Sequence, residues 1–501
     1  MHARKSVIVL AALALMTSVL LVAPAAADHH TASGCDSDYV HVDGKNITVL
    51  PSGGDDTANL QCALDLGVAM PWARVMLVEG DYYTSFLEAE GFRGVFRGES
   101  RHKTTLKTLP DGLDCIARGD QAGDLALVTF AASRVNVKGI TFAIGGAAAC
   151  QEPYDEFEPE PGVTFRNWSI AALLATTRLR TTDACPDVVD HKTEVYGIGV
   201  ESEYPDFTGP VIDAAGYFAG VIVGPPGGVF ADDCFDQMRG TTIVRGSHFT
   251  GNDLSVILGG HTDSHDYVGG RHPWQGNVMN DVSLGVLYEF SSGGRVVVGQ
   301  NKIVDAHNWG VLVFGDPGEA TTTAKIIRNH IRGIDDADGI GAIDLGPLED
   351  AGQMLNSKIG WNKIEIDDTP FNGIVAVGTD GRILNNKITG KATAGILLDG
   401  LGFFDEEAEE FVLIQPSTGW RIAKNWFPKF DFEAADILLL EPTAENTVEC
   451  AWWGHEVIDL GIDNELIGCG ESGAPTAATQ AAGVDRSGLE KALANRGRYG
   501  R

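Results

Sequence analysis

The sequence predicts a parallel β-solenoid, because two features recur along it at related intervals. An asparagine returns after 24, 28, 33, 24, 39 and 39 residues, and a large apolar side chain follows two residues later. About ten residues further on there is usually a short apolar strand entered through a small residue, as in "WGVLVF" from Trp309 and "NGIVAV" from Asn372. Several short strands in a repeat of about two dozen residues are typical of stacked parallel coils. The asparagines are Asn277, Asn301, Asn329, Asn362, Asn386, Asn425 and Asn464.

We expect each asparagine to lie at a corner of its coil with its side chain pointing inward. Around Asn329, for example, Ile327 and Ile331 fit an inward position in a period-two pattern. Asparagine tolerates the left-handed backbone conformation that a sharp corner requires. Its amide both donates and accepts hydrogen bonds, so stacked asparagines can satisfy buried polar groups from coil to coil.

The N-terminal part predicts one helix. The stretch "ITVLPSGGDDTANLQCALDLG" from Ile47 contains a strand, a Gly-Asp turn and a helix that begins near Asp56 or Thr57. The residues at i, i+3, i+4 and i+7 form one small, apolar helix face. They are Leu60, Ala63, Leu64 and Gly67.

The repeat, its asparagines and this entry segment together resemble the right-handed parallel β-helix proteins of the pectin-lyase-like superfamily, over roughly residues 45 to 470. The resemblance implies an entry strand and capping helix within 28–70, followed by a right-handed parallel β-helix over 71–470. A cap is needed because an exposed terminal coil is an unpaired sheet edge. The paired aspartates, Gly-His-Gly and Arg-x-Lys of polygalacturonases are not evident, nor is the Arg-x-Pro-x-x-Arg segment of pectate lyases. The resemblance therefore predicts the fold and leaves the activity open.

The two ends of the chain predict segments outside the solenoid. Residues 1–27 combine Arg4 and Lys5, an apolar stretch and an Ala-Ala-Ala cleavage site, as a secretory signal peptide does. We therefore expect a secreted protein, extracellular or periplasmic, of a bacterial type. Residues 471–501 have the composition of a flexible tail.

Eight cysteines fit an oxidising compartment, since their number is even and no Cys-x-x-Cys metal spacing occurs. Pairs that are near in the chain suggest Cys35–Cys62 and Cys450–Cys469 as disulfides. The formal net charge of −32 argues against nucleic acid or an anionic membrane as the partner. We expect no membrane insertion, and a monomer.

Basic and aromatic residues flank the asparagines and predict an outward stripe that would bind an extracellular, acidic polysaccharide. Successive coils are about 4.8 Å apart, which is comparable to one sugar unit. Charge and ring stacking would then hold an extended chain. The alternative is that exposed strands simply carry long soluble side chains. The predicted substrate-binding residues are Lys302, Arg328, His330, Trp361, Lys363, Lys387 and Trp426.

Aspartates follow some of the predicted strands, and they suggest two kinds of site. Carboxylates on adjacent coils could hold Ca²⁺, the one ion that the sequence suggests as a cofactor, or form the acid/base pair of a glycoside hydrolase. The alternative is ordinary turn chemistry, because Asp is a common turn residue. The candidate ligands are Asp335, Asp336, Asp338, Asp367 and Asp368.

A histidine-rich stretch, "GGHTDSHDYVGGRHPW" from Gly259, reads as an insertion between two coils. Its histidines and aspartates could bind a metal or transfer protons, or it could be a polar surface loop. The residues concerned are His261, Asp263, His265, Asp266 and His272.

These patterns favour an exported β-helix protein that binds a polysaccharide. They leave open whether it also cleaves the polysaccharide, as a lyase or as a glycoside hydrolase. The catalytic residues are not identified by the sequence. β-Elimination would need a base, and a cation beside the uronate carboxylate, roles that residues of the predicted stripe could fill. The alternatives are a non-catalytic carbohydrate-binding or structural β-helix protein and, from the histidine stretch alone, a metal-handling protein.

Overall fold

The fold is taken from a computed structural model. It describes residues 35, 38–110, 125–145, 170–176, 189–202, 218–224, 238–252, 254–259, 263–270, 272–291, 293–315, 322–334, 341–346, 354–367, 372–405, 410–415, 417–428, 430–440, 443–450 and 455–469. The predicted signal peptide, residues 1–27, and the predicted flexible tail, residues 471–501, therefore lie outside the described residues. No helix of the described residues has the length and apolar character needed to span a membrane.

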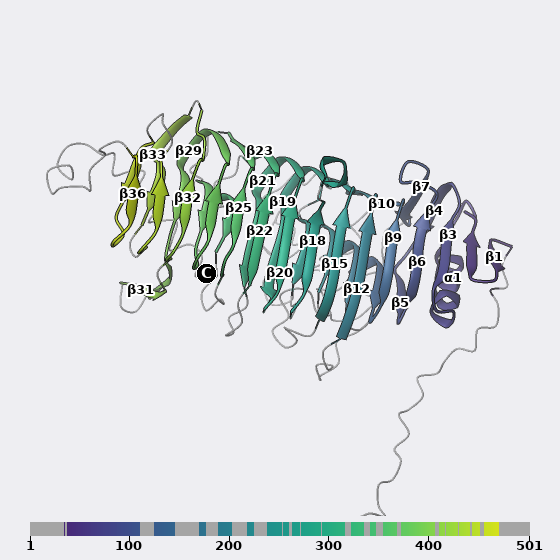
Figure 1. Ribbon diagram of the computed structural model, residues 1–501. Helices are drawn as coiled ribbons and strands as arrows, with labels where there is room; N and C mark the ends of the chain where they lie inside the picture. The colour runs from purple at the N-terminus through teal and green to yellow at the C-terminus, as the bar shows by residue number, and fades with distance from the viewer. Residues whose placement is uncertain are drawn as a thin grey trace, which may run out of the picture. The chain divides into compact units, whose positions relative to one another are not determined.

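The described residues from 38 to 469 form a right-handed parallel β-helix with an N-terminal helix, as the sequence predicts (Figure 1). Each coil contributes a strand to a first sheet, turns a corner, and continues through a second and a third face that share one sheet. Among the described strands nearly all pairs are parallel. The two antiparallel pairs there are β1 with β2, and β30 (Leu401–Asp405) with β31 (Glu410–Gln415). The first sheet, in order, holds β1 (Val40–Asp43), β2 (Asn46–Val49), β3 (Ala73–Leu77), β6 (Arg93–Gly98), β9 (Arg134–Lys138), β12 (Val189–Tyr196), β15 (Met238–Arg245), β18 (His265–Gly269), β20 (Arg295–Gly299), β22 (Thr323–Ile327), β25 (Lys358–Gly360), β28 (Arg382–Leu384), β32 (Arg421–Ala423), β34 (Thr447–Glu449) and β36 (Glu465–Ile467).

The second and third faces are formed by the other strands, and three long strands bend from one face into the other. The second face holds β4 (Gly80–Thr84), β7 (Thr104–Thr108), β10 (Thr141–Ile144), β13 (Gly199–Ser202), β16 (His248–Thr250), β23 (His330–Ile334), β26 (Lys363–Ile366) and the first parts of β19 (Val278–Ser291), β21 (Lys302–Gly315) and β29 (Lys387–Leu398). The third face holds the remainders of β19, β21 and β29 with β5 (Leu87–Glu90), β8 (Leu125–Ala131), β11 (Ile170–Thr176), β14 (Phe218–Val223), β17 (Leu254–Gly259), β24 (Gly341–Leu345), β27 (Asn372–Ala376), β33 (Phe430–Leu439) and β35 (Val457–Asp459).

The core is a set of apolar columns inside the coils. On the second face, the apolar residues two positions after the asparagines are buried, as predicted. On the first sheet, one column runs through the aliphatic residues Val195, Val244, Val268, Val298, Ile326, Ile359, Ile383 and Ile422, all 0% exposed. The column on the second face comprises Met279, Ile303, Ile331, Ile364, Ile388 and Phe427.

The helix α1 (Thr57–Ala69) lies at the N-terminal end of the stack, the purple end in Figure 1. It buries the predicted face of Leu60, Ala63, Leu64 and Gly67 against the first coils. A Cβ atom on Gly67 would lie 2.5 Å from the Phe92 ring, so only glycine fits this contact. The helix therefore covers the apolar interior at this end.

The asparagines make a continuous stack of hydrogen bonds. The backbone N–H and the Nδ2 of Asn301 donate to Oδ1 of Asn329 over 3.0 and 3.1 Å. Its Nδ2 also donates to the carbonyl of Val268 over 3.0 Å. The same contacts join each asparagine to the next, through Asn277, Asn301, Asn329, Asn362, Asn386 and Asn425. Six buried amides thus satisfy backbone donors at this corner.

Two details of the predicted corner are wrong. The left-handed residue precedes the asparagine, for example Arg328 with a φ of 57°, and this residue reverses the inward and outward alternation. As a result Ile326, not Ile327, packs inside. Asn464 also belongs to a different corner, which comes before the first-sheet strand. There its Oδ1 accepts the backbone N–H of Asn446 over 2.9 Å.

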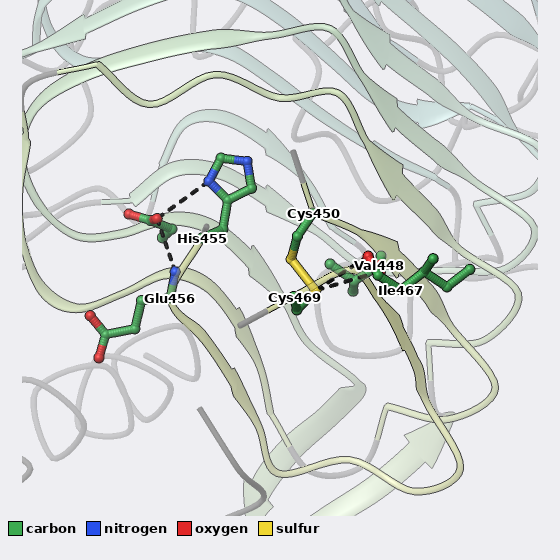
Figure 2. The surroundings of a disulfide bond; sticks show 7 residues. Val448, Cys450, His455, Glu456, Ile467 and Cys469 are labelled. Atoms are coloured by element: carbon green, nitrogen blue, oxygen red, sulfur yellow. Dashed lines mark hydrogen bonds and ion pairs between the residues drawn. A yellow bond between two sulfur atoms is a disulfide. The ribbon is translucent and has the colours of Figure 1, made fainter. Parts of the chain in front are cut away.

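The disulfide Cys450–Cys469 forms as predicted and joins the residues that follow β34 and β36, on adjacent coils (Figure 2). The nearby His455 lies inside the last coils, with its Nδ1 3.5 Å from Oδ2 of Asp436. Cys35 and Cys62 are also disulfide-bonded. The other four cysteines lie outside the described residues.

Both sides of the third face are buried. Its outward row reads Leu174, Ile222, Ile257, Leu287 and Leu312 on successive coils, and these side chains form an apolar cluster. The next residue in that row is Asp344, followed by Val375. Burial raises the pKa of the Asp344 carboxyl from 3.8 to about 7. A single carboxylate therefore interrupts an otherwise apolar row.

Candidate functional site: a basic ridge across the corner

The predicted stripe is assembled on consecutive coils. Strand register places Lys302, His330, Lys363 and Lys387 side by side on the second face, and Trp426 follows Lys387 through a single bridge. Their side chains are exposed or half-buried. Arg328 and Trp361 stand at the left-handed corner positions of two of these coils, with φ of 57° and 56°. The residues lie together as the sequence predicts, but their role in binding stays a prediction.

The structure adds a row on the first sheet that the sequence reasoning missed. Lys325, Lys358, Arg382 and Arg421 pair in register on four successive strands, β22, β25, β28 and β32. Each lies on the same coil as a left-handed corner residue and a second-face residue of the predicted stripe, and the corner residue itself belongs to the stripe on two of the four coils. The signal was present in the sequence, since a basic residue precedes each of these asparagines by four positions.

Together these residues form one surface, which we call the basic ridge. Each coil presents three outward positions to it: one on the first sheet, one at the corner and one at the start of the second face. Only Asn385 among the corresponding positions of the four coils is neither basic nor aromatic. The basic ridge comprises Lys302, Lys325, Arg328, His330, Lys358, Trp361, Lys363, Arg382, Lys387, Arg421, Lys424 and Trp426.

Cations of the ridge lie over its two tryptophans. Lys358 Nζ is 4.4 Å from the centre of the Trp361 ring, and Arg328 Cζ is 5.9 Å from the same ring. Lys387 Nζ lies 4.7 Å from the Trp426 ring. These cation–π contacts hold the long side chains in place. A sugar that stacked on either ring would therefore compete with a neighbouring cation for the ring face.

Part of the ridge charge is offset locally. Lys363 forms an ion pair with Glu365, and this contact lowers the pKa of the Glu365 carboxyl. Arg421 pairs with Glu449 over 2.7 Å. Burial and the neighbouring Lys363 lower the pKa of His330, whose Nε2 is 3.3 Å from Lys363 Nζ. His330 is therefore neutral at neutral pH and would contribute charge only in acid.

A hollow of about 650 Å³ on the first sheet adjoins the ridge. Arg245, Arg295, Lys325 and Arg328 line it. Gly269 lines it as well, and only glycine fits at this position, because a Cβ there would lie 1.9 Å from the carbonyl oxygen of Gly299. Part of the histidine-rich stretch also lines this hollow, through Tyr267, Gly269, Gly270 and His272. That stretch and two ridge residues thus meet in one place.

The interpretation of this stretch as an insertion is wrong. Residues His265–Gly269 are strand β18, a regular member of the first sheet. Strand alternation turns His265 outward and buries Asp266, whose Oδ1 accepts the backbone N–H of Thr242 over 2.8 Å. His261 lies outside the described residues. The described residues bring no three potential metal ligands together, so the metal-handling hypothesis gains no support there.

The predicted Ca²⁺ ligands are tested only in part. Asp367 is exposed at the end of β26. Asp335, Asp336, Asp338 and Asp368 lie outside the described residues. A Ca²⁺ site at these turns stays a prediction.

Comparison with known proteins identifies similar folds and no family. No family model matches the chain, and no curated protein matches it. Among solved structures, the A-module of a mannuronan C-5 epimerase from Azotobacter vinelandii aligns over 83% of this chain and 92% of its own, at 13% identity and a TM-score of 0.32. An exopolygalacturonase from Thermotoga maritima aligns over 86% and 93%, at 11% identity and a TM-score of 0.26. A tailspike protein from a bacteriophage of Escherichia coli O157:H7 aligns over 83% and 45%, at 11% identity and a TM-score of 0.33. These low TM-scores carry no functional information about this chain.

Proposed function

We propose that this protein binds an extended acidic polysaccharide outside the cytoplasm, along the basic ridge. The observation that carries the proposal is the alignment of basic and aromatic side chains on four successive coils of a chain whose net charge is −32. Random placement of cations would not leave a row of them in register. The disulfide Cys450–Cys469 supports an oxidising compartment.

The geometry suits a polymer better than a small molecule. Coils repeat about every 4.8 Å, so the ridge offers one set of cations for each sugar-sized step. Each exposed contact contributes little by itself, because water and salt screen it. Several contacts on one chain add through effective concentration. We therefore expect affinity to rise with polymer length and to fall as salt increases.

The test is a binding titration of the purified protein with polygalacturonate, with neutral galactan as the uncharged control. The main variant carries Lys325→Thr, Lys358→Thr and Arg382→Thr, because Thr447 occupies the same row on a later strand. We expect it to bind polygalacturonate about tenfold more weakly, on the order of 0.5 kcal/mol per exposed cation. The matched control is a second triple variant, which removes the same charge from N-terminal strands. It carries Arg74→Thr, Arg93→Thr and Lys138→Thr.

Equal loss in both triple variants would show that only net charge matters, and the ridge would then have no special role. Binding of galactan as strong as that of polygalacturonate would overturn the acidic-polymer proposal. At the corner, Arg328→Asn removes a cation without a new backbone cost, since Asn385 already occupies the equivalent left-handed position with a φ of 57°. It should weaken binding by roughly two- to threefold, as one exposed cation would.

A β-eliminating lyase is the second candidate function. It is favoured by one observation, the neutral imidazole of His330 beside the Lys363 ammonium, with 3.3 Å between Nε2 and Nζ. Lys363 would exchange its ion pair with Glu365 for a uronate carboxylate, and His330, released from its contact with Lys363, would accept the proton next to that carboxylate. Incubation with polygalacturonate, followed by unsaturated-product absorbance and reducing ends, tests this. Formation of both products, and their loss in His330→Asn, would establish it; no product at any Ca²⁺ concentration would leave a binding protein.

A further inference from the structure

A groove of about 750 Å³ lies on the second face, on coils that precede the ridge. It crosses strands β7, β10, β13 and β16 and shares no residue with the basic ridge. Its floor is low because small residues occupy it. Gly199 lies between Thr141 and His248 in strand register, and a Cβ on Gly199 would be 2.5 Å from Oγ1 of Thr141. The sequence at Gly199 thus specifies a depression in the sheet surface.

Arg101 is fixed at the edge of this groove. Its Nη1 donates to the carbonyl of Gly246 over 3.0 Å, although 145 residues separate the two in sequence. Its own carbonyl accepts the hydroxyl of Thr141 over 2.6 Å. The first contact holds the guanidinium and the second holds the backbone of Arg101 before any ligand arrives, which lowers the entropy cost of binding. No carboxylate among the described residues forms an ion pair with Arg101.

Two histidines accompany Arg101 in the lining, His102 beside it and His248 on β16. His102 Nε2 is 3.3 Å from Arg101 Nε. Burial lowers the pKa of His248, and the charges of Arg101 and His102 lower it further. Arg101 and His102 therefore disfavour a positive charge on His248, and a bound anion would offset that repulsion.

The remaining charged groups of the groove are two. Lys107 is paired with Asp81 over 2.7 Å and lies 5.7 Å from the Tyr83 ring. Glu201 stands on β13 beside the Gly199 floor. Hydroxyl groups of threonines in the lining complete a polar surface that could bond to sugar hydroxyls.

We propose that this groove binds one anionic sugar unit, a free uronic acid or the end of a uronate chain, with the carboxylate against Arg101, His102 and His248. The volume lies within the range of small-molecule sites. Binding would draw a proton onto His248, because the carboxylate favours the imidazolium form. Affinity should therefore increase as the pH falls from 8 to 6. The carboxylate of Glu201 would disfavour ligands that carry a second negative charge.

Calorimetric titration of the full chain with D-glucuronate tests the proposal, and D-glucose, in which a hydroxymethyl group replaces the carboxylate, is the matched ligand. We expect glucuronate to bind at least tenfold more tightly than glucose, and several-fold more tightly at pH 6 than at pH 8. Arg101→Gln should lose at least tenfold in affinity. His248→Asn should keep binding at pH 8 and lose much of the pH dependence, a change that a merely structural role would not produce.

The outcomes separate this groove from the ridge. The triple variant Lys325→Thr, Lys358→Thr and Arg382→Thr should bind glucuronate like the unmodified protein. If that variant loses glucuronate and Arg101→Gln does not, the monosaccharide binds at the ridge and the groove proposal is wrong. Equal affinities for glucuronate and glucose, or a pH dependence unchanged in His248→Asn, would also overturn it. If Arg101→Gln does not fold, the His248→Asn titration still decides.

Discussion

The N-terminal and C-terminal coils build the same corner with different residues. In the N-terminal coils the left-handed position is glycine, at Gly139, Gly197 and Gly246, with φ of 61° to 66°. A buried Ile140, Ile198 or Ser247 follows. In the C-terminal coils the left-handed residue has a side chain and an asparagine follows; these residues are Gln300, Arg328, Trp361, Asn385 and Lys424.

The contrast explains where the two proposed sites lie. Glycine adopts the left-handed conformation without cost but presents no side chain, so the N-terminal corner is low and the groove forms beside it. In the C-terminal coils the asparagine stack holds the corner, and a left-handed residue with a side chain is tolerated. Those side chains contribute to the basic ridge. The choice at one backbone position thus decides between a depression and a ridge.

The largest expected effect on stability comes from placing the corner residue of the N-terminal coils in the C-terminal coils. Asn362→Ile copies Ile198 into the asparagine stack, and it removes the acceptor for the backbone N–H of Asn329, at 2.9 Å, and a donor to Asn386, at 3.0 Å. Because each buried group left without a partner costs roughly 1–3 kcal/mol, we expect the free energy of unfolding to fall by about 3 kcal/mol or more. Chemical denaturation measures it.

Ile198→Val, at the equivalent position of the other half, is the control and should cost roughly 1 kcal/mol. If Asn362→Ile lowers the free energy of unfolding by less than Ile198→Val does, the asparagine hydrogen bonds are not needed to hold these coils together.

A smaller and pH-dependent effect is expected at Asp344, where the apolar outward row of the N-terminal coils gives way to a carboxyl. Its pKa of about 7 in the folded protein lies above the unfolded value of 3.8. The contribution of this carboxyl to folding stability is therefore greatest below about pH 4 and falls as the pH rises to 7. Asp344→Asn should therefore raise stability at pH 8, by about 2 kcal/mol and at most roughly 4, and change little at pH 4. Thermal unfolding at both pH values measures this.

Asp367→Asn replaces an exposed aspartate and should leave the melting temperature nearly unchanged at both pH values. A gain at Asp344 that is the same at pH 4 and pH 8 would show that the effect is not one of ionisation.

The smallest expected effect isolates the backbone. Gly197→Ala adds a Cβ whose nearest neighbour is 4.0 Å away, so its cost comes from the φ of 61° alone. We expect a loss of about 1 kcal/mol. Gly197→Asn should lose less, because asparagine tolerates this conformation. If alanine and asparagine are equally tolerated by denaturation, the glycines of the N-terminal corners are not there for their φ.

The sequence was sufficient for the fold because each coil repeats one pattern of burial. The period of the asparagines predicted the stacking, and the apolar residues after them predicted the inner column that contains Ile303 and Ile331. The corner itself was misassigned by one residue. A left-handed residue reverses the alternation, and nothing in the pattern of Ile327-Arg328-Asn329 states which residue makes the turn.

The site could be predicted only where its residues lie near an asparagine. The second-face row from Lys302 to Lys387 was predicted because it is read directly from the repeat. The row from Lys325 to Arg421 lies on the other side of the corner and was missed. The groove could not be found in this way, since Arg101 and Gly246 meet only through stacking of distant coils. The histidine stretch was interpreted wrongly because it was treated as an insertion, although part of it is a strand. In a strand, neighbouring side chains point to opposite faces, so His265 and Asp266 are separated.

The direction of the asparagine stack has a consequence for how the chain is made. Each asparagine from Asn277 to Asn386 donates to the next asparagine later in the sequence, as Asn301 does to Asn329 and Asn329 to Asn362. During synthesis from the N-terminus, the most recently formed coil would therefore lack acceptors for its corner donors. Those acceptors are supplied by the asparagine of the next coil. Each coil thus depends on the next one for its corner hydrogen bonds. If synthesis stopped anywhere between Asn277 and Asn425, the corner donors of the last coil would have no asparagine acceptor.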